Sequence, residues 1–195
     1  MSSEHGIYAK LPGFAEAPMR VAFHQAIPLK TVVVYCPDPR ASEIPAAVAR
    51  EFDQVWPGEV VRDETGAKVG FTNNIGQVIT VGGRAIDALR SVTVLNHMLG
   101  VENVVIVHHT FCGTTAFTPD GLFEAFDQEE GADIRHLHAP VDLAIEDFEQ
   151  SLRHDVAVIR DAPGTPKQIN VFGYIYDIDT ETLTKVVEDL APVTP

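Results

Sequence analysis

The sequence predicts an α/β protein: a central, mostly parallel β-sheet with helices on both faces and a C-terminal antiparallel hairpin strand. Two apolar runs rich in β-branched residues, 31–35 and 104–107, have the composition of strands buried on both faces. Stretches with helical periodicity separate the apolar runs. Because strands that alternate with helices are joined by right-handed crossovers, we expect them to lie parallel.

Turn signals and apolar stripes place the individual elements. The run 77–81 leads into Gly82-Gly83, and the helix after it carries an apolar stripe that ends at Gly100. Residues 56–76 hold several turn signals, which predict a long excursion with a small hairpin over 63–68. The expected strands are 31–36, 77–81, 104–108, 169–176 and 183–187, and the expected helices are about 43–52, 86–99, 121–128 and one long helix over 140–162.

Length and composition indicate a soluble protein with one domain. The 195 residues suffice to bury a full core, and the hydrophobic share of 45% is ordinary for a globular chain. A net charge of −14 makes nucleic acid and anionic membranes poor partners. Residues 1–5 resemble no secretory signal, and no apolar stretch reaches the roughly 18 residues that span a bilayer. We therefore expect a cytoplasmic protein.

Cysteine and histidine follow two of the expected buried strands. Cys36 ends the first strand, and His109 and Cys112 follow the third with a spacing that lets both side chains turn to one point. The carboxyl ends of parallel strands are where functional side chains gather. Zinc prefers these donor types, and a catalytic zinc keeps three protein ligands, so we predict a Zn²⁺ site. A disulfide between the two cysteines is the alternative, which a cytosolic setting disfavours.

The segment Cys36-Pro37-Asp38-Pro39-Arg40 adds a charged pair beside the first thiol. Each proline biases the residue before it away from the helical region, so Cys36, Asp38 and Arg40 are expected to lie on one side of an extended chain. Asp38 then either reaches the metal or pairs with Arg40, which would keep the carboxylate ionised. A surface ion pair of little energetic weight is the plainer interpretation, and the neighbouring Cys36 argues against it.

Cys-x-Asp-x-Arg, a Gly-Gly-Arg turn and His-x-x-Cys-Gly, in that order on successive strand ends, resemble the β-class carbonic anhydrases. The likeness runs from Thr31 to about Val187 and includes the closing Gly173–Asp177 segment. The resemblance implies zinc held by Cys36, His109 and Cys112, with Asp38 and Arg40 as the catalytic dyad.

The same resemblance implies reversible hydration of carbon dioxide to bicarbonate by a zinc-bound hydroxide. It also implies a homodimer or a dimer of dimers. Residues 1–30 are then an N-terminal arm or short helix that packs on a partner subunit, and residues 31–190 form a single zinc-binding catalytic domain. Backbone amides near Gly82-Gly83 and the Cys112-Gly113 turn are expected to stabilise the developing charge.

The sequence departs from the family pattern at the mouth of the expected site. Phe111 stands where relatives often carry a polar or acidic residue, so we expect a substrate pocket with an apolar wall beside Gly82, Gly83 and Gly113. Such a pocket also suits carbonyl sulfide, because carbonyl sulfide hydrolases resemble this family. A weakly active or non-catalytic zinc-binding homologue is the third alternative.

Two polar residues near the motifs are assigned ordinary structural roles. His108 points away from His109 on its strand, so we predict a packed, hydrogen-bonded histidine rather than a ligand. Arg84, directly after the glycines, is predicted to cap or to pair rather than to bind substrate.

Overall fold

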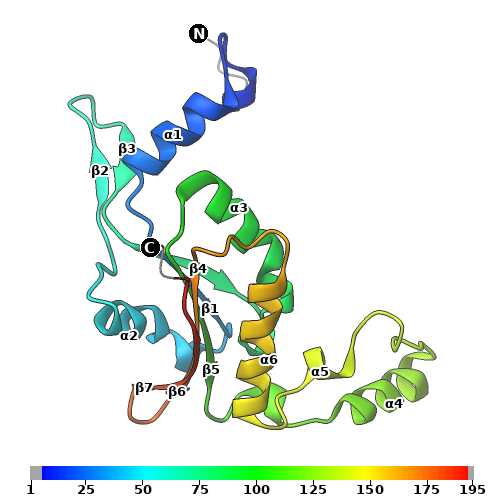
Figure 1. Cartoon of the computed structure of the whole chain (residues 1–195). Helices are drawn as coiled ribbons and strands as arrows, with labels where there is room; N and C mark the ends of the chain where they lie inside the picture. Colours follow the sequence, from blue (N-terminus) through cyan, green and yellow to red (C-terminus); the bar gives the residue numbers. More distant parts are fainter. Residues whose placement is uncertain (1–5, 193–195) are drawn as a thin grey trace.

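Five strands form the central sheet, in the order β4-β1-β5-β6-β7 (Figure 1). The computed structural model describes residues 6–192. The three pairings β4–β1, β1–β5 and β5–β6 are parallel, and β7 is antiparallel to β6. The predicted mostly parallel sheet with a C-terminal antiparallel strand is confirmed. The strands are β1 (Thr31–Tyr35), β4 (Ile75–Ile79), β5 (Asn103–His109), β6 (Asn170–Asp177) and β7 (Thr182–Asp189).

Helices cover both faces of this sheet. Helix α2 (Ile44–Glu51) packs on one face, and α3 (Leu89–Leu99) and α6 (Phe148–Asp161) pack on the other (Figure 1). Every residue of β1 and β5 is buried, because both faces of these central strands are covered. This double burial is why their sequences read as continuous apolar runs without alternation.

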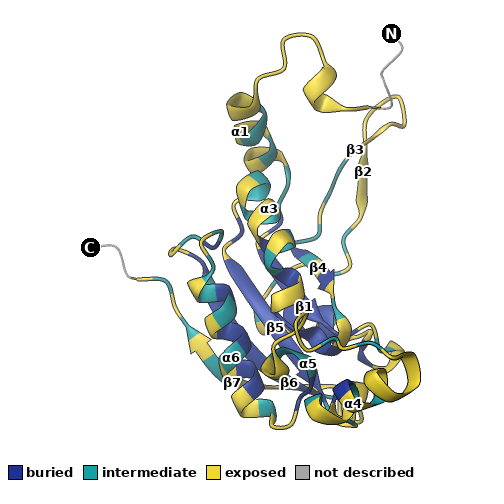
Figure 2. Cartoon of the chain, turned by 90° about the vertical axis from the view of Figure 1, so that its right-hand side faces the viewer, coloured by how far each residue is buried: buried dark blue, intermediate teal, exposed yellow. Residues whose placement is uncertain are grey.

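The remaining elements stand outside the layered core and are largely exposed (Figure 2). Helix α1 (Glu16–Ala26) has no buried residue, and it lies within the residues 1–30 that were expected to form an arm or short helix. The expected hairpin is also present, as β2 (Val60–Arg62) and β3 (Lys68–Phe71). Helix α4 (Pro119–Glu130) begins two residues earlier than expected, because the Thr118 hydroxyl accepts from the Gly121 amide and caps it.

Residues 1–5 of the expected 1–30 arm lie outside the described part of the chain. Within residues 6–192, no helix has the length and apolar character needed to cross a bilayer.

The long helix predicted over 140–162 is wrong: two helices occupy the segment. Helix α5 (Pro140–Leu143) ends at Ala144, whose backbone is extended, and α6 begins four residues later. The Asp147 carboxylate accepts from the Gln150 amide and caps the new helix, and Arg84 donates to the Ala144 carbonyl. The prediction failed because the apolar periodicity continues across the break. The Asp147 cap and the Arg84 contact are what interrupt the helical backbone there.

A buried ion pair joins the sheet to α6. Arg84 donates from Nε and Nη2 to the two oxygens of Asp155 at 2.9 and 3.0 Å, and both side chains are almost inaccessible to solvent. His108 Nε2 lies 3.2 Å from the same carboxylate. The predicted structural roles of His108 and Arg84 are therefore confirmed.

Asp155→Asn is expected to lower the free energy of unfolding of the metal-free protein by about 3–5 kcal/mol at pH 7, because Arg84 loses its buried counter-charge. Burial raises the pKa of Asp155, but hydrogen bonds from His108 and Arg84 outweigh it, and the pKa lies below its ordinary value. The ionised carboxylate therefore stabilises the fold above about pH 4, and this stabilisation is lost as pH falls through the folded-state pKa.

Urea denaturation of both proteins at a series of pH values from 7 downward measures this contribution. The difference in unfolding free energy should narrow as the medium becomes more acidic. A difference that stays constant with pH would contradict the assignment.

Candidate metal centre

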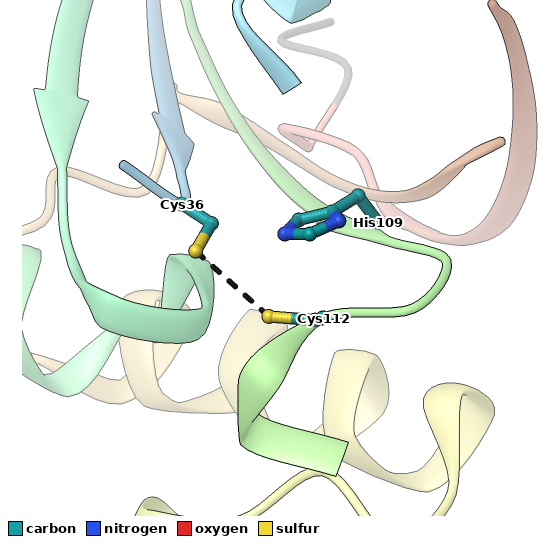
Figure 3. Close-up of side chains that lie close together, drawn as sticks. All are labelled: Cys36, His109 and Cys112. Carbon is teal, nitrogen blue, oxygen red and sulfur yellow. Dashed lines mark hydrogen bonds between the residues drawn. The ribbon is translucent and has the colours of Figure 1, made fainter. Parts of the chain in front are cut away.

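Two cysteines and one histidine converge at the carboxyl edge of the sheet (Figure 3). Cys36 follows β1, His109 ends β5, and Cys112 lies three residues further on. Their ligand atoms all lie within 4.8 Å of one another, and all three residues are buried. The two sulfur atoms are 3.8 Å apart. The structure thus brings together the three residues that the sequence selected.

The histidine presents an unused nitrogen to the two thiols. His109 Nδ1 lies 2.9 Å from the Thr110 carbonyl oxygen, so Nδ1 carries the proton that is donated to this oxygen. His109 Nε2 therefore has a lone pair, and it is buried without a hydrogen-bond partner. Metal-ligating histidines commonly donate their second ring nitrogen to a carbonyl in this way. The buried Nε2 without a hydrogen-bond partner is the strongest indication that these residues suit a metal ion.

The thiols occupy different environments. Burial raises the pKa of Cys112, but the adjacent His109 ring and hydrogen bonds from Thr114 outweigh it and lower the pKa to about 7. The Thr114 hydroxyl lies 3.1 Å from the Cys112 sulfur. For Cys36, burial outweighs the hydrogen bonds from the amides of Asp38 and Gly82, and the pKa lies above its ordinary value. The surroundings therefore favour thiolate, the form that binds zinc, at Cys112 but not at Cys36.

Asp38 and Arg40 lie beside the cluster as a bidentate pair. Arg40 Nε and Nη2 lie 3.0 and 2.6 Å from the Asp38 oxygens, and Arg40 Nη2 also donates to the Phe111 carbonyl. The hydrogen bonds from Arg40 hold the pKa of Asp38 well below its usual range. Asp38 Oδ2 is 4.0 Å from His109 Nε2.

The extended path expected through Arg40 is wrong, because Pro39–Ala41 form a 3-10 turn. Asp38 caps this turn by accepting from the Arg40 amide at 2.9 Å, and the turn brings the guanidinium back onto the carboxylate. Of the two alternatives for Asp38, the structure shows the pairing with Arg40.

The two glycines after β4 are held between neighbouring backbones. Gly83 has φ +69°, and a Cβ there would lie 2.6 Å from the Val107 carbonyl oxygen. Gly82 has φ +71°, and a Cβ there would press on Thr114. Their amides are already engaged, since Gly82 donates to the Cys36 sulfur and Gly83 to the Thr80 carbonyl. These amides therefore help to hold the wall of the site beside the Cys36 sulfur.

Phe111 is 71% exposed and has φ +53°, an unusual conformation for a residue with a large side chain. Together with Thr110, Glu146 and Phe148 it lines a surface cavity of about 630 Å³. Thr110 and Phe111, which line this cavity, belong to the loop between His109 and Cys112, so an exposed aromatic residue lies next to the cluster in the chain.

Sequence reasoning missed two residues of the surroundings, Thr114 and Asp155. Asp155 left a signal: it falls on the apolar stripe of its helix, between Leu152 and Ile159, and it is fully buried. A carboxylate in such a stripe requires buried partners. Thr114 left no comparable signal, because its contact with Cys112 depends on the local turn.

This architecture defines an α/β protein with a buried Cys-His-Cys cluster suited to a metal ion. No protein-family model matches the chain. The β-carbonic anhydrase 1 of Mycobacterium tuberculosis is 33% identical over 115 residues, which are 58% of this chain and 64% of that relative. A carbon disulfide hydrolase of Acidianus sp. is 26% identical over 132 residues, which are 57% of this chain and 62% of that relative. These matches span less than two thirds of the relatives' length.

Among solved structures, the carbonic anhydrase from Streptococcus mutans matches with a TM-score of 0.61 and 25% identity, over 92% of this chain and 91% of that chain. The chain is therefore similar in sequence and fold to β-class carbonic anhydrases, and in sequence also to a carbon disulfide hydrolase, so the predicted resemblance is confirmed.

Gly83→Ala is expected to lower the free energy of unfolding by more than about 2 kcal/mol, because a side chain meets both a left-handed backbone and the Val107 carbonyl. Gly113→Ala is the matched control at the same centre: a Cβ there meets nothing within 4 Å, and the change should stay within about 0.5 kcal/mol. Chemical denaturation of both variants measures the effect. Equal losses in the two variants would contradict the packing described for Gly83.

Proposed function

We propose that this chain is a zinc enzyme that reversibly hydrates carbon dioxide to bicarbonate. The observation that carries the proposal is the buried cluster of Cys36, His109 and Cys112 with an ionised, arginine-held carboxylate beside it. Three protein donors leave one position open, as in catalytic zinc sites. Homology to named carbonic anhydrases supports the same assignment.

Zinc, when bound by Cys36, His109 and Cys112, supplies Lewis-acid chemistry that lowers the pKa of water from 15.7 toward about 7. Asp38 acts on the nucleophile: it stays ionised, so it can only accept a hydrogen bond, and it thereby orients the attacking water. Arg40 fixes the direction of Asp38 through two parallel hydrogen bonds. Gly82, Gly83 and Gly113 border the substrate, with Phe111 on the rim.

A second activity, hydrolysis of carbonyl sulfide or carbon disulfide, is favoured by the rim of the site. The exposed Phe111 gives the mouth an aromatic surface, and the larger, more apolar sulfur cumulenes gain more than carbon dioxide from contact with such a surface. Named carbon disulfide hydrolases are among the homologues. The donor set and the dyad would serve either substrate. We rank this activity second, because the identity to the named carbonic anhydrase is higher than that to the named carbon disulfide hydrolase.

We also propose that the chain works as a homodimer or dimer of dimers, with residues 1–30 as an arm on the partner and residues 31–190 as the catalytic domain. Helix α1 supports this proposal, because it has no buried residue and leaves Val21 53% exposed. A cytoplasmic location fits the two free thiols, which a reducing compartment keeps available for metal.

Cys112→Ser is expected to reduce bound zinc from about one ion per chain to a small fraction of that, because serine does not replace a thiolate donor. Metal analysis of the purified proteins measures the ratio, and circular dichroism checks that the variant is folded. A folded variant with the wild-type zinc content would exclude Cys112 as a ligand.

Stopped-flow hydration of carbon dioxide, alongside sulfide release from carbonyl sulfide and carbon disulfide, tests the activity. The zinc-loaded chain is expected to have its highest kcat/KM with carbon dioxide. A higher kcat/KM for a sulfur substrate would establish the second activity instead. Background rates with all three would leave a non-catalytic zinc-binding protein.

In the same assay, Arg40→Ala should lower kcat/KM by roughly 100-fold while zinc content is unchanged, because Asp38 loses its orientation. Arg135→Ala is a matched control, since Arg135 contacts Asp133 through its amide and guanidinium in an equivalent Asp-x-Arg pair, with both side chains exposed. Arg135→Ala should leave kcat/KM unchanged. Loss of zinc in Arg40→Ala would instead assign Arg40 to the integrity of the centre.

A further inference from the structure

One buried carboxylate receives donors from two other segments of the chain. Asp155 is completely inaccessible to solvent, and its oxygens lie 2.9 and 3.0 Å from Arg84, 3.2 Å from His108 Nε2 and 3.3 Å from the Ala85 amide. Arg84 follows the glycine turn, His108 lies near the end of β5, and Asp155 lies on α6. Two of these segments adjoin the metal centre: His108 directly precedes His109, and Arg84 follows the glycine turn beside Cys36.

The contact with His108 bears on His109. Successive side chains of a strand leave opposite faces, so the direction of His108 sets the direction of its neighbour. His108 is fully buried, and its hydrogen bond to Asp155 fixes the ring toward α6. His109 is thereby turned away from α6, toward Cys36 and Cys112.

The contact with Arg84 bears on Cys36. Arg84 is two residues from Gly82, whose amide donates to the Cys36 sulfur. The Thr80 hydroxyl donates to the Arg84 carbonyl at 3.0 Å and closes the turn around the two glycines. Holding the guanidinium on Asp155 therefore holds the turn that supports the Cys36 thiolate.

A chain of hydrogen bonds also connects Arg84 to Cys112. Arg84 also donates to the carbonyls of Ala144 and Val141, at 2.9 and 2.8 Å. The next amide, that of Ile145, donates to the Thr114 carbonyl at 3.0 Å. The Thr114 hydroxyl in turn lies 3.1 Å from the Cys112 sulfur.

We propose that Asp155 is a positioning residue for the metal centre, which through His108 and Arg84 sets the placement of His109, Cys36 and Cys112 together. The inference rests on the proposed zinc function. It extends that function to a residue of α6 that makes no hydrogen bond to Cys36, His109 or Cys112. Outer partners of metal ligands typically change metal affinity 10- to 100-fold when they are removed.

Two pairs of variants separate positioning from general stability. His108→Leu removes the donor to Asp155, whereas His108→Gln keeps an N–H donor near the position of Nε2. Asp155→Asn removes the charge, whereas Ile159→Ala, four residues along α6, opens a cavity in the apolar core without touching the network. Ile159→Ala has a comparable cost in stability, of about 2–5 kcal/mol.

Two readouts are used, and neither depends on turnover. Zinc affinity is measured by competition with a chromogenic chelator, and donor geometry by the visible absorption spectrum of the Co²⁺-loaded protein. His108→Leu and Asp155→Asn are expected to weaken zinc binding about 10- to 100-fold and to alter the Co²⁺ spectrum. His108→Gln and Ile159→Ala should match the wild type in both measurements.

Wild-type affinity and spectrum in His108→Leu would overturn the proposal, whether or not Asp155→Asn folds. An equal loss of affinity in Ile159→Ala would also overturn it, because it would assign the effect to stability alone. A wild-type chain that binds neither metal would overturn the zinc function, and this inference with it. If the wild type binds metal, and His108→Leu and Asp155→Asn bind it equally well, the inference would be overturned and the zinc function would stand.

Discussion

The buried pairing of Arg84 with Asp155 is the interaction on which the arrangement of the site depends. Removing two charges from water carries a large desolvation cost, so such a pair contributes less to net stability than to fixing one geometry. Here the Arg84 guanidinium donates four hydrogen bonds, two to the Asp155 carboxylate and two to the carbonyls of Val141 and Ala144. The pair thus joins the glycine turn, helix α6 and the segment that breaks the predicted long helix.

Convergence of the donors follows from the parallel sheet. Adjacent strands that run in the same direction end at the same edge, so Cys36 after β1 and His109 at the end of β5 meet without a long loop between them. The glycines after β4 allow a third backbone to approach this edge closely enough for an amide to reach a sulfur. The wall of the centre is thus completed by the backbone of Gly82 and Gly83, and not by a side chain.

Hydrogen bonds around the centre act on the protonation of Asp38, His109 and Cys112. Arg40 holds Asp38 ionised, the Thr110 carbonyl fixes the proton of His109 on Nδ1, and Thr114 donates to Cys112. A proposed hydration site needs this combination: thiolates and a neutral imidazole for the metal, and an acceptor for the attacking water.

The sequence by itself predicted a mostly parallel sheet, the approximate bounds of its five strands and the three donors, because β-branched runs and short motifs act over a few residues. The strand order β4-β1-β5-β6-β7 and the pairing of Asp38 with Arg40, rather than a contact with the metal, came only from the structure. Tertiary structure alone decided that Arg40 reaches Asp38 through a 3-10 turn, that residues 140–161 form two helices, and that Asp155 lies beneath the centre. The turn at Arg40 and the start of α6 depend on side-chain caps that apolar periodicity does not show, and the place of Asp155 depends on Arg84, 71 positions away in the chain.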